Sequence, residues 1–314
     1  MEFVNDVKWE KEKSISQLVN NFETLGFQSR QLSAAKKVIV RMKKEGAKIY
    51  LTYTSNMVTS GLRGFFAQLI QLGMADVIVT TVGGVEEDIM KAFGEKFIIG
   101  KFSEDDVELY EKGINRVGNL LVTNESYCKL EDSLTKIIRE LCGEKTRWTP
   151  SELLRAIGLR LEDKNSILYQ AAKNNVPIFV PAITDGAFGF HLFMQQQKQD
   201  DFVVDVVGDF RNIMLSTSHD EKKGIISLGG SVSKHHAIMA CLLNGGLDFA
   251  VYMTTARPTS GSMSGATTNE AKSWGKIKDD SDAATVLGDV TVNFPLAMMA
   301  ALDELEKENL LRKE

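Results

Sequence analysis

The sequence is poor in cysteine, which excludes a small extracellular scaffold built on disulfides. Its three cysteines, Cys128, Cys142 and Cys241, cannot all pair, and none stands in a Cys-x-x-Cys or Cys/His spacing. A chain of 314 residues, 43% of them hydrophobic, can bury a large core without such bridges. We therefore expect inert thiols in a reducing compartment and a cytoplasmic protein.

Long apolar runs and basic clusters are also missing. No run approaches the roughly 20 apolar residues that cross a bilayer. The charged start of the chain, Met1 to Ser16, lacks the apolar stretch of a signal peptide. The formal charge of −5 is spread along the chain, whereas a nucleic-acid surface needs clustered Lys and Arg. We expect a soluble protein that binds neither membranes nor nucleic acids.

Apolar runs typical of buried strands alternate with longer amphipathic segments. The runs stand at 48–53, 76–80, 177–180, 202–206, 224–228 and 249–253. Val and Ile in nearly continuous runs are typical of parallel strands with helices on both faces. The alternation predicts a doubly wound, mainly parallel α/β sheet. Without repeats or a Pro/Gly linker, we predict a single domain over 1–314, with 1–20 as a mobile N-terminal extension.

Polar and glycine clusters follow the predicted strands, where open α/β sheets bind their ligands. The clusters lie at 54–56, 80–88, 184–186, 229–231, 254–255 and 288–289. Glycine at such a turn lets backbone N–H groups approach a phosphate at a helix N-terminus. A single cluster is most often an ordinary turn, but six at strand ends favour a ligand site. The sequence has no Gly-x-Gly-x-x-Gly fingerprint, so these clusters do not form a standard dinucleotide-binding motif.

Two of the four histidines, His235 and His236, are adjacent. Neighbours on a helix point about 100° apart, so one metal ion cannot easily take both. No Cys, Asp or Glu stands at a matching spacing, and we expect no metal site. Either one histidine packs or caps locally and the other is exposed, or one of them serves as an acid or base near neutral pH.

The segment from Ser260 is small and polar and predicts a loop, which ends in Glu270, Trp274 and Lys276. A loop of that length with such residues at its end suggests a site. Most loop lysines are solvated. A lysine shielded by a neighbouring tryptophan would instead present a neutral amine, which forms imines with carbonyls.

The run Ser273-Trp274-Gly275-Lys276-Ile277 and the triplet Lys234-His235-His236 resemble two signatures of the deoxyhypusine synthase family. Further matching segments follow in order at 53–56, 83–88, 113–119 and 181–186, over roughly residues 25–302. The resemblance implies a Rossmann-like fold, NAD as cofactor and a homotetramer with active sites between paired subunits. It implies a transferase of hypusine biosynthesis, which uses NAD to oxidise and cleave the polyamine spermidine. The butylimine is held on the lysine, passed to one lysine of a translation factor and reduced to deoxyhypusine.

The resemblance also implies a role for each matching position. Lys276 is the imine-forming nucleophile, and His235 assists proton removal. Glu270 holds the amine by its charge and Trp274 by its π face. The positions that match the family's NAD contacts are Ser55, Asn56, Thr59, Thr81, Glu87, Asp185, Gly229, Ser231, Thr255, Ser264, Gly288 and Asp289. Of these, Glu87 or Asp289 can accept a hydrogen bond from a ribose hydroxyl.

Two positions in the substrate site depart from the family pattern. The family has acids that hold ammonium groups of spermidine where this chain has Phe190 and Met263. Hydrogen bonds to charged groups contribute about 1.5–3 kcal/mol each, so losing two weakens a polyamine by roughly two to four powers of ten. Three interpretations stay open. Other groups bind the amine; the donor or acceptor is a different small amine, as in homospermidine-forming or agmatine-using relatives; or the chain is a non-catalytic NAD-binding partner subunit.

Overall fold

The computed structural model describes residues 3–312, which belong to two compact units. Unit 1 comprises residues 1–53, 71–79 and 212–314, and unit 2 comprises residues 54–70 and 80–211. The chain passes from one unit to the other four times. Three of these passages fall inside a regular element and not in a linker: α3 (Arg63–Gln71), β2 (Val77–Thr80) and α10 (Val206–Met214). The prediction of one domain stays a prediction. Of the predicted N-terminal extension, residues 1–2 lie outside the described part.

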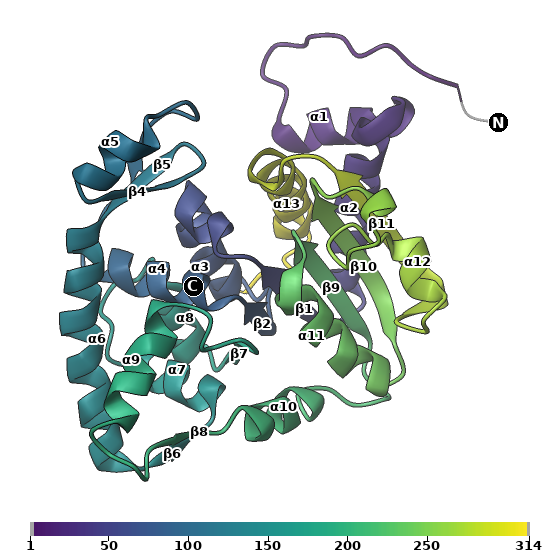
Figure 1. The fold of residues 1–314 in the computed structure, drawn as a ribbon. Coiled ribbons are helices and arrows are strands. Elements are labelled where there is room, and N and C mark those ends of the chain that lie inside the picture. Colours follow the sequence, from purple (N-terminus) through teal and green to yellow (C-terminus); the bar gives the residue numbers. More distant parts are fainter. Residues whose placement is uncertain (1–2, 313–314) are drawn as a thin grey trace. The chain divides into compact units, whose positions relative to one another are not determined.

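Unit 1 is built on a mainly parallel sheet, in which strands are ordered β11-β10-β9-β1-β2 (Figure 1). Besides β2, its strands are β1 (Lys48–Tyr53), β9 (Lys223–Leu228), β10 (Leu247–Thr254) and β11 (Ile277–Leu287). The pairs β1/β9, β9/β10 and β10/β11 are all parallel, and every residue of β9 is buried. Strands buried on both faces read as continuous apolar runs, which confirms the predicted fold class.

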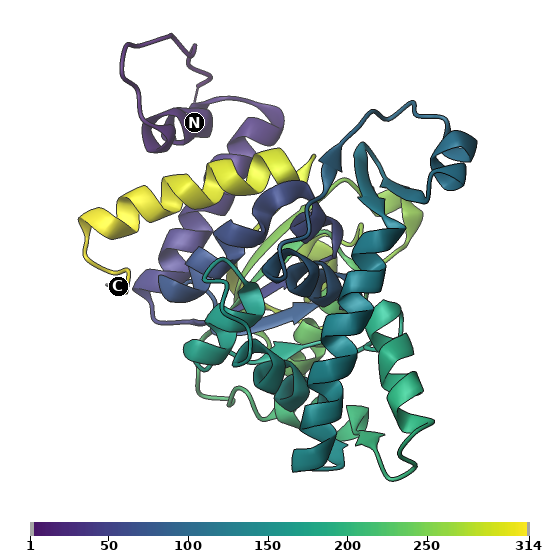
Figure 2. The ribbon, with the colours of Figure 1, turned by 90° about the vertical axis from the view of Figure 1, so that its left-hand side faces the viewer.

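Helices cover both faces of this sheet. On one face α2 (Phe27–Lys44) packs closely, because a Cβ on Gly224 of β9 would lie 2.8 Å from the Met42 side chain. Phe249, in the same rung as Gly224, has the Arg41 guanidinium 5.7 Å from its ring centroid. Helix α13 (Val290–Lys307) lies along α2, and α11 (Ser231–Leu243) packs on β1, β9 and β10 from the other side (Figures 1 and 2).

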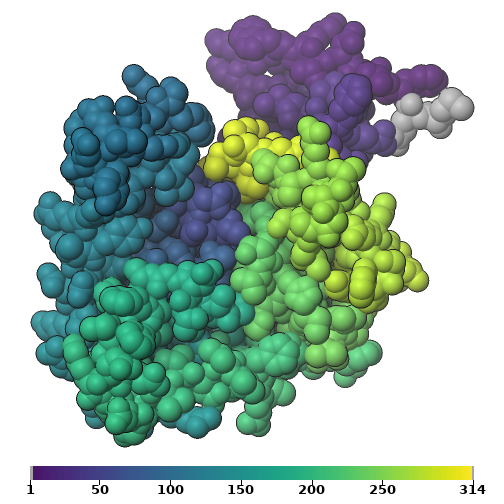
Figure 3. All heavy atoms as spheres, viewed as in Figure 1, coloured from purple at the N-terminus to yellow at the C-terminus, as the bar shows by residue number. Residues whose placement is uncertain are grey.

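The N-terminal part of unit 1 contains one short helix. Helix α1 (Ile15–Asn21) begins at Ser14, whose hydroxyl accepts from Gln17 N while the Gln17 side chain accepts from Ser14 N. It packs on α13 and α2 and buries Val19 completely. Residues 3–14 lie at the surface without regular structure (Figure 3). Trp9, within this segment, is 87% exposed. A 3-10 turn (Phe22–Thr24) leads into α2.

Unit 2 is mainly helical. Its helices besides α3 and α10 are α4 (Val82–Ala92), α5 (Asp106–Glu111), α6 (Asn124–Glu144), α7 (Pro150–Gly158), α8 (Ile167–Lys173) and α9 (Ala187–Gln196). A three-stranded antiparallel sheet is ordered β3-β5-β4, from β3 (Ile98–Ile99), β4 (Ile114–Val117) and β5 (Leu120–Thr123). Further short strands are β6 (Arg147–Trp148), β7 (Ile178–Phe179) and β8 (Val203–Val204).

One strand expectation was wrong. The run 202–206 was expected to add to the main sheet, but β8 pairs with β6 in a separate two-stranded sheet. Neither residue of β8 is fully buried, so this apolar run does not form part of the central core. Within the described residues, no helix is long and apolar enough to cross a membrane.

Candidate active site

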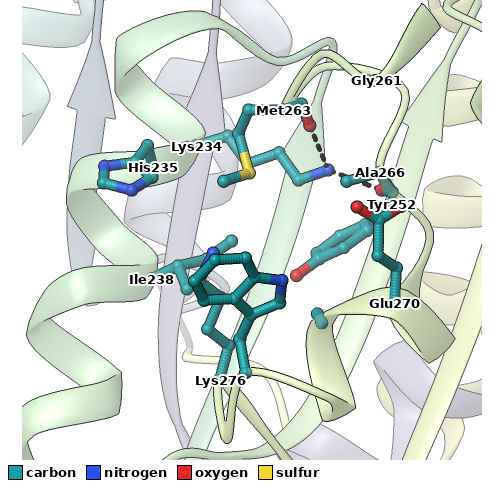
Figure 4. A pocket seen from close by; sticks show the side chains of 11 residues that line it. Lys234, His235, Ile238, Tyr252, Gly261, Met263, Ala266, Glu270 and Lys276 are labelled. Atoms are coloured by element: carbon teal, nitrogen blue, oxygen red, sulfur yellow. Dashed lines mark hydrogen bonds between the residues drawn. The ribbon is translucent and has the colours of Figure 1, made fainter.

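A cavity of about 250 Å³ opens in unit 1 beside β10, between α11 and the segment 261–276 (Figure 4). It contains five residues predicted from the sequence to act in catalysis or amine binding: His235, Met263, Glu270, Trp274 and Lys276. The other lining residues are Lys234, Ile238, Tyr252, Gly261, Ala266 and Ala271. Residues up to 42 positions apart in the sequence therefore meet in one pocket of one unit.

Lys276 is held by backbone contacts on both sides. The short helix α12 (Thr268–Lys272) is capped by Thr267, whose hydroxyl accepts from Glu270 N (3.2 Å). At Gly275 the backbone has φ 66°, a left-handed conformation that glycine adopts without strain, and the chain turns back. Lys276 N then donates to Ala271 O (3.1 Å), and Lys276 O accepts from Leu247 N (3.1 Å). The lysine enters β11 with its side chain only 7% exposed.

The Lys276 amine meets an aromatic face and no acid. Its Nζ lies 4.8 Å from the centroid of the Trp274 ring, within the range of a cation–π contact. Within residues 3–312 it has no hydrogen bond or ion pair. Trp274 is 67% exposed, so it covers the amine from the solvent side and is not itself part of the core.

Lys234 has the opposite environment, because all its donors are engaged. It is fully buried on α11, and its Nζ donates to Met263 O (3.0 Å) and Ala266 O (2.9 Å). The same nitrogen lies 3.8 Å from the centroid of the Tyr252 ring. Burial lowers the pKa of Lys234 to about 8. The lysine thus ties the loop 263–266 to α11.

His235 follows Lys234 on α11 and lies at the rim, on the side of the pocket away from Glu270 (Figure 4). Partial burial, and then the nearby Lys276 charge, lower the pKa of His235 below its ordinary 6.5. A neutral imidazole at pH 7 is able to accept a proton. Burial lowers the pKa of the neighbouring His236 further, to about 4. Of the two histidines, His235 is the one that faces the pocket.

Two further polar groups in the pocket lack partners within residues 3–312. The Tyr252 hydroxyl is buried without a hydrogen bond and is directed toward the middle of the cavity (Figure 4). The Glu270 carboxylate, at the exposed end of the pocket, makes no hydrogen bond or ion pair. A buried polar group without a partner costs about 1–3 kcal/mol, so such groups are expected where a ligand binds. Sequence reasoning did not single out Tyr252, because it lies inside the apolar strand run 249–253.

The predicted cofactor residues of unit 1 gather at the carboxyl edge of the sheet. Parallel pairing aligns Tyr53, Leu228 and Met253 at the strand ends, and the turns after them carry Gly229, Ser231, Thr255, Gly288 and Asp289. Ser264 joins this edge, because its hydroxyl accepts from Ser231 N (3.1 Å). A Cβ on Gly230 would lie 2.4 Å from Ser264 Cα, so only glycine allows this approach.

The predicted cofactor residues of unit 2 form a second group around the start of α4. Thr81 is the N-cap residue of α4, and its hydroxyl accepts a hydrogen bond from Ser55 N (3.0 Å). Asn56 follows Ser55 in the chain. Thr59 lies in a π-helical turn (Val58–Leu62), and its hydroxyl donates to Glu87 Oε2 (2.5 Å). Burial raises the pKa of Glu87 to about 7.

Asp185 and Phe190 lie at the start of α9 in unit 2 and not in the Lys276 pocket of unit 1. Asp185 is exposed, just before the helix. Phe190 is 56% exposed, and its ring contacts His191 edge-on at 5.8 Å between centroids. Of the two departures from the family pattern, the pocket in unit 1 contains only Met263.

Fold and pocket together define a class: an α/β protein with glycine-rich turns at one sheet edge and a buried lysine amine against an aromatic ring. The family model for deoxyhypusine synthase matches residues 17–301. Deoxyhypusine synthase of Senecio vernalis is 43% identical over 79% of this chain and 68% of the relative. That of Candida glabrata is 37% identical over 91% of this chain and 86% of the relative. The chain therefore belongs to the deoxyhypusine synthase family of transferases.

Solved structures agree with this assignment. A crystal structure of an Entamoeba histolytica protein assigned to the same family has a TM-score of 0.69 and 30% identity, over 96% of this chain and 97% of that one. The complex of AgrE with ornithine and NAD+ has a TM-score of 0.57 but 12% identity, over 90% of this chain and 34% of AgrE. The second likeness concerns the fold alone.

Proposed function

We propose that the chain is an NAD-dependent aminobutyltransferase that carries its group as an imine on Lys276. In the family's reaction the donor is spermidine and the acceptor is one lysine of the hypusine-containing translation factor. The observation that carries the proposal is the Lys276 amine, buried against Trp274 and free of hydrogen bonds within residues 3–312. A lysine nitrogen that is not held by a hydrogen bond or an acid is available to attack a carbonyl or imine carbon.

The neighbouring side chains suit the steps around this lysine. A neutral His235 is able to take the proton that the donor nitrogen loses as its carbon is oxidised. The Glu270 carboxylate is available for an ammonium group at the far end of the donor. The Tyr252 hydroxyl points into the cavity and is able to hydrogen-bond a donor nitrogen or the imine nitrogen.

The residues of the sheet edge fit a dinucleotide. The turn at Gly229–Ser231 has positive φ at both ends (82° and 61°) and leads into the N-terminus of α11, and a helix N-terminus is a place where anions bind. Asp289, after β11, supplies a carboxylate of the kind that binds ribose hydroxyls. When bound, NAD would accept and return a hydride. A protein with the same fold, AgrE, was crystallised with NAD+.

The wider setting follows from the same family relationship. We infer a homotetramer in the cytoplasm, with spermidine and the translation factor as partners and no bound metal. The exposed apolar side chains of α9, Phe190, Phe193 and Met194, are consistent with burial by another subunit.

A second candidate is transfer to or from a different small amine, and Met263 favours it. A thioether lines the pocket where the family has an acid, so the chain's own contribution to cation binding is reduced. The third alternative, a non-catalytic NAD-binding subunit, has no comparable support, because the pocket retains Lys276, His235 and Glu270 together.

The two candidates are distinguished by following label from spermidine that is labelled in its butyl part. With NAD and the purified translation factor, we expect label on one lysine of the factor, and none when Lys276 is replaced by alanine. Label in a small amine, formed without any protein acceptor, would favour the second candidate. Absence of labelled product in both assays, with NAD binding intact, would contradict both.

A further inference from the structure

Lys91 stands in the last turn of α4, and its side chain contacts a neighbouring turn of unit 2. Its Nζ donates to Val58 O (2.6 Å) and Thr59 O (3.4 Å). The centroid of the Phe97 ring lies 4.8 Å from the same nitrogen, within the range of a cation–π contact. All four residues belong to unit 2 of one chain, so these contacts do not depend on how subunits associate.

The turn that Lys91 contacts is π-helical and comprises Val58–Leu62. Its backbone leaves helical geometry at Gly61, where φ is 108° and ψ is 4°. Turns of this kind are rare and frequently lie at functional sites. Two of its carbonyl oxygens accept from the Lys91 ammonium, so this side chain stabilises the turn at Thr59.

Thr59 connects the π-helical turn to Glu87. Its hydroxyl lies 2.5 Å from Glu87 Oε2 and 3.2 Å from Ser55 O. Ser55 N in turn donates to the hydroxyl of Thr81, the N-cap residue of α4 (3.0 Å). The segment from Ser55 to Thr59 is therefore held against α4 at its N-cap, in its middle and in its last turn, and Lys91 supplies the last of these contacts.

The charge of Lys91 also acts on Glu87. The two residues are four positions apart on α4, a spacing that places them on the same face of a helix. Burial raises the pKa of Glu87 to about 7, while the Thr59 hydrogen bond and the Lys91 charge oppose this rise and the Glu86 charge adds to it. Tyr127 on α6 lies near both glutamates and stays neutral, because burial raises its pKa above the ordinary value of 10.0.

We propose that Lys91 is a positioning residue of the predicted cofactor site in unit 2. It holds the π-helical turn so that Thr59 meets Glu87, and it keeps a positive charge one helical turn from the Glu87 carboxylate. An ionised carboxylate is the stronger acceptor for a ribose hydroxyl. The proposal rests on the proposed function in one respect, that Glu87 contacts NAD, and it names the residue that controls this contact.

The test measures NAD binding and not turnover. Fluorescence titrations with NAD, at several pH values between about 6 and about 9, compare the full-length protein with Lys91→Met and Lys91→Arg. Methionine neither donates nor carries charge, whereas arginine does both. Lys96→Met is the matched control, because this lysine lies five residues later and is exposed. Circular dichroism checks folding, and Lys91→Gln is the second neutral variant if Lys91→Met does not fold.

We expect the affinity of the unchanged protein for NAD to rise with pH as Glu87 ionises near pH 7. In Lys91→Met the rise should move upward by roughly one pH unit, because the nearby positive charge is lost, and the affinity at pH 7 should fall roughly fivefold. Lys91→Arg and Lys96→Met should keep the profile of the unchanged protein. Unchanged binding by Lys91→Met, or a loss by the same factor at every pH, would overturn the proposal.

Unfolding without NAD distinguishes this proposal from the proposed function. The unchanged protein should lose stability as pH rises from about 4.5 through about 7, since folded Glu87 retains its proton there, and in Lys91→Met this loss should continue to higher pH. Combining Glu87→Gln with Lys91→Met should remove the difference. The same pH dependence with and without Lys91 would overturn the proposal alone. Failure of the unchanged protein to bind NAD would reject the cofactor function itself.

Discussion

Two regions of the molecule differ in how completely their polar side chains are paired. In unit 2, the Asp88 carboxylate of α4 is 1% exposed and saturated with donors: Arg63 Nε (2.6 Å), Ser166 Oγ (2.8 Å), Ile167 N (3.0 Å) and Leu168 N (2.8 Å). In unit 1, the Lys276 amine, the Tyr252 hydroxyl and the Glu270 carboxylate have no such partners within residues 3–312. The first region joins three helices, and the second surrounds a cavity.

The contrast separates groups that hold the fold from groups that remain for a ligand. A saturated buried ion stabilises only as part of its cluster, and removing one partner leaves an unpaired charge. An unsaturated buried group costs stability in the free protein and is retained where binding or chemistry uses it. Variants in the first region should therefore change stability, and variants in the second should change transfer.

The largest expected effect follows from Lys276→Ala. Without the amine no imine forms, so transfer should fall by at least roughly 10³-fold while the unfolding midpoint changes little. The assay is transfer of labelled aminobutyl group, with NAD binding measured in parallel. Lys272→Ala is the matched control, because this lysine lies four residues earlier and its amine donates to a backbone carbonyl, Asp279 O (2.7 Å), outside the pocket lining. Full activity of Lys276→Ala would disprove the covalent role.

Asp88→Asn should give the largest loss of stability. The substitution removes the charge that pairs Arg63, and breaking a buried pair typically costs about 3–5 kcal/mol. Arg63 keeps its second ion pair with Asp163 (2.7 Å), so we expect the lower end of this range. Urea unfolding measures the change. A loss below about 1 kcal/mol would mean that the cluster contributes no more than a surface ion pair.

Glu87→Gln, one residue earlier on α4, should act in the opposite direction. The folded protein raises the pKa of Glu87 to about 7, so it holds a proton that the unfolded chain has lost, and stability falls as pH rises from about 4.5 to 7. Glutamine cannot ionise. The variant should therefore be close to the unchanged protein at pH 4.5 and exceed it by roughly 3 kcal/mol at pH 8.

The same Glu87→Gln variant should bind NAD more weakly, because a neutral amide is a poorer acceptor for a ribose hydroxyl than a carboxylate. Unfolding curves at the two pH values and a fluorescence titration with NAD test both parts. Equal stability differences at pH 4.5 and pH 8 would show that Glu87 titrates as an ordinary surface acid.

The smallest change in stability is expected from Tyr252→Phe. Its hydroxyl has no partner within residues 3–312, so no hydrogen bond is lost when it is removed. The unfolding free energy should stay the same or rise by less than about 1 kcal/mol. Tyr50→Phe is the control, because the Tyr50 hydroxyl is hydrogen-bonded to Ser216 Oγ (2.7 Å) and its removal should cost about 1 kcal/mol. Amine affinity should drop only in Tyr252→Phe. Equal destabilisation by both substitutions would place Tyr252 among structural residues.

The central fold was predictable because its strands are buried on both faces. The run 48–53 coincides with β1, and the runs 224–228 and 249–253 fall within β9 and β10. Strand β11 was missed, since its first half carries Lys278, Asp279, Asp280 and Asp282 at the edge of the sheet. An edge strand is half solvated and lacks the apolar run on which the prediction depends. The division into two units could not be predicted from the sequence. Three of the four passages between the units lie inside a helix or strand, so no linker marks the boundary.

Much of the pocket could also be anticipated. His235, Glu270, Trp274 and Lys276 came from a motif resemblance, and the fold brings them together with Met263. Their roles stay predictions. Lys234 and Tyr252 could not be assigned from sequence, since their positions depend on contacts between α11, β10 and the loop 263–266. An unpartnered tyrosine inside a strand is visible only once its neighbours are placed.

The covalent role of Lys276 is the central claim, and borohydride trapping tests it most directly. The protein is incubated with NAD and, separately, spermidine, homospermidine, 1,4-diaminobutane and agmatine, reduced, digested and analysed by peptide mass. We predict a butylamine-sized adduct on Lys276 from at least one donor, absent without NAD. No adduct from any donor, in protein shown to bind NAD, would contradict the account.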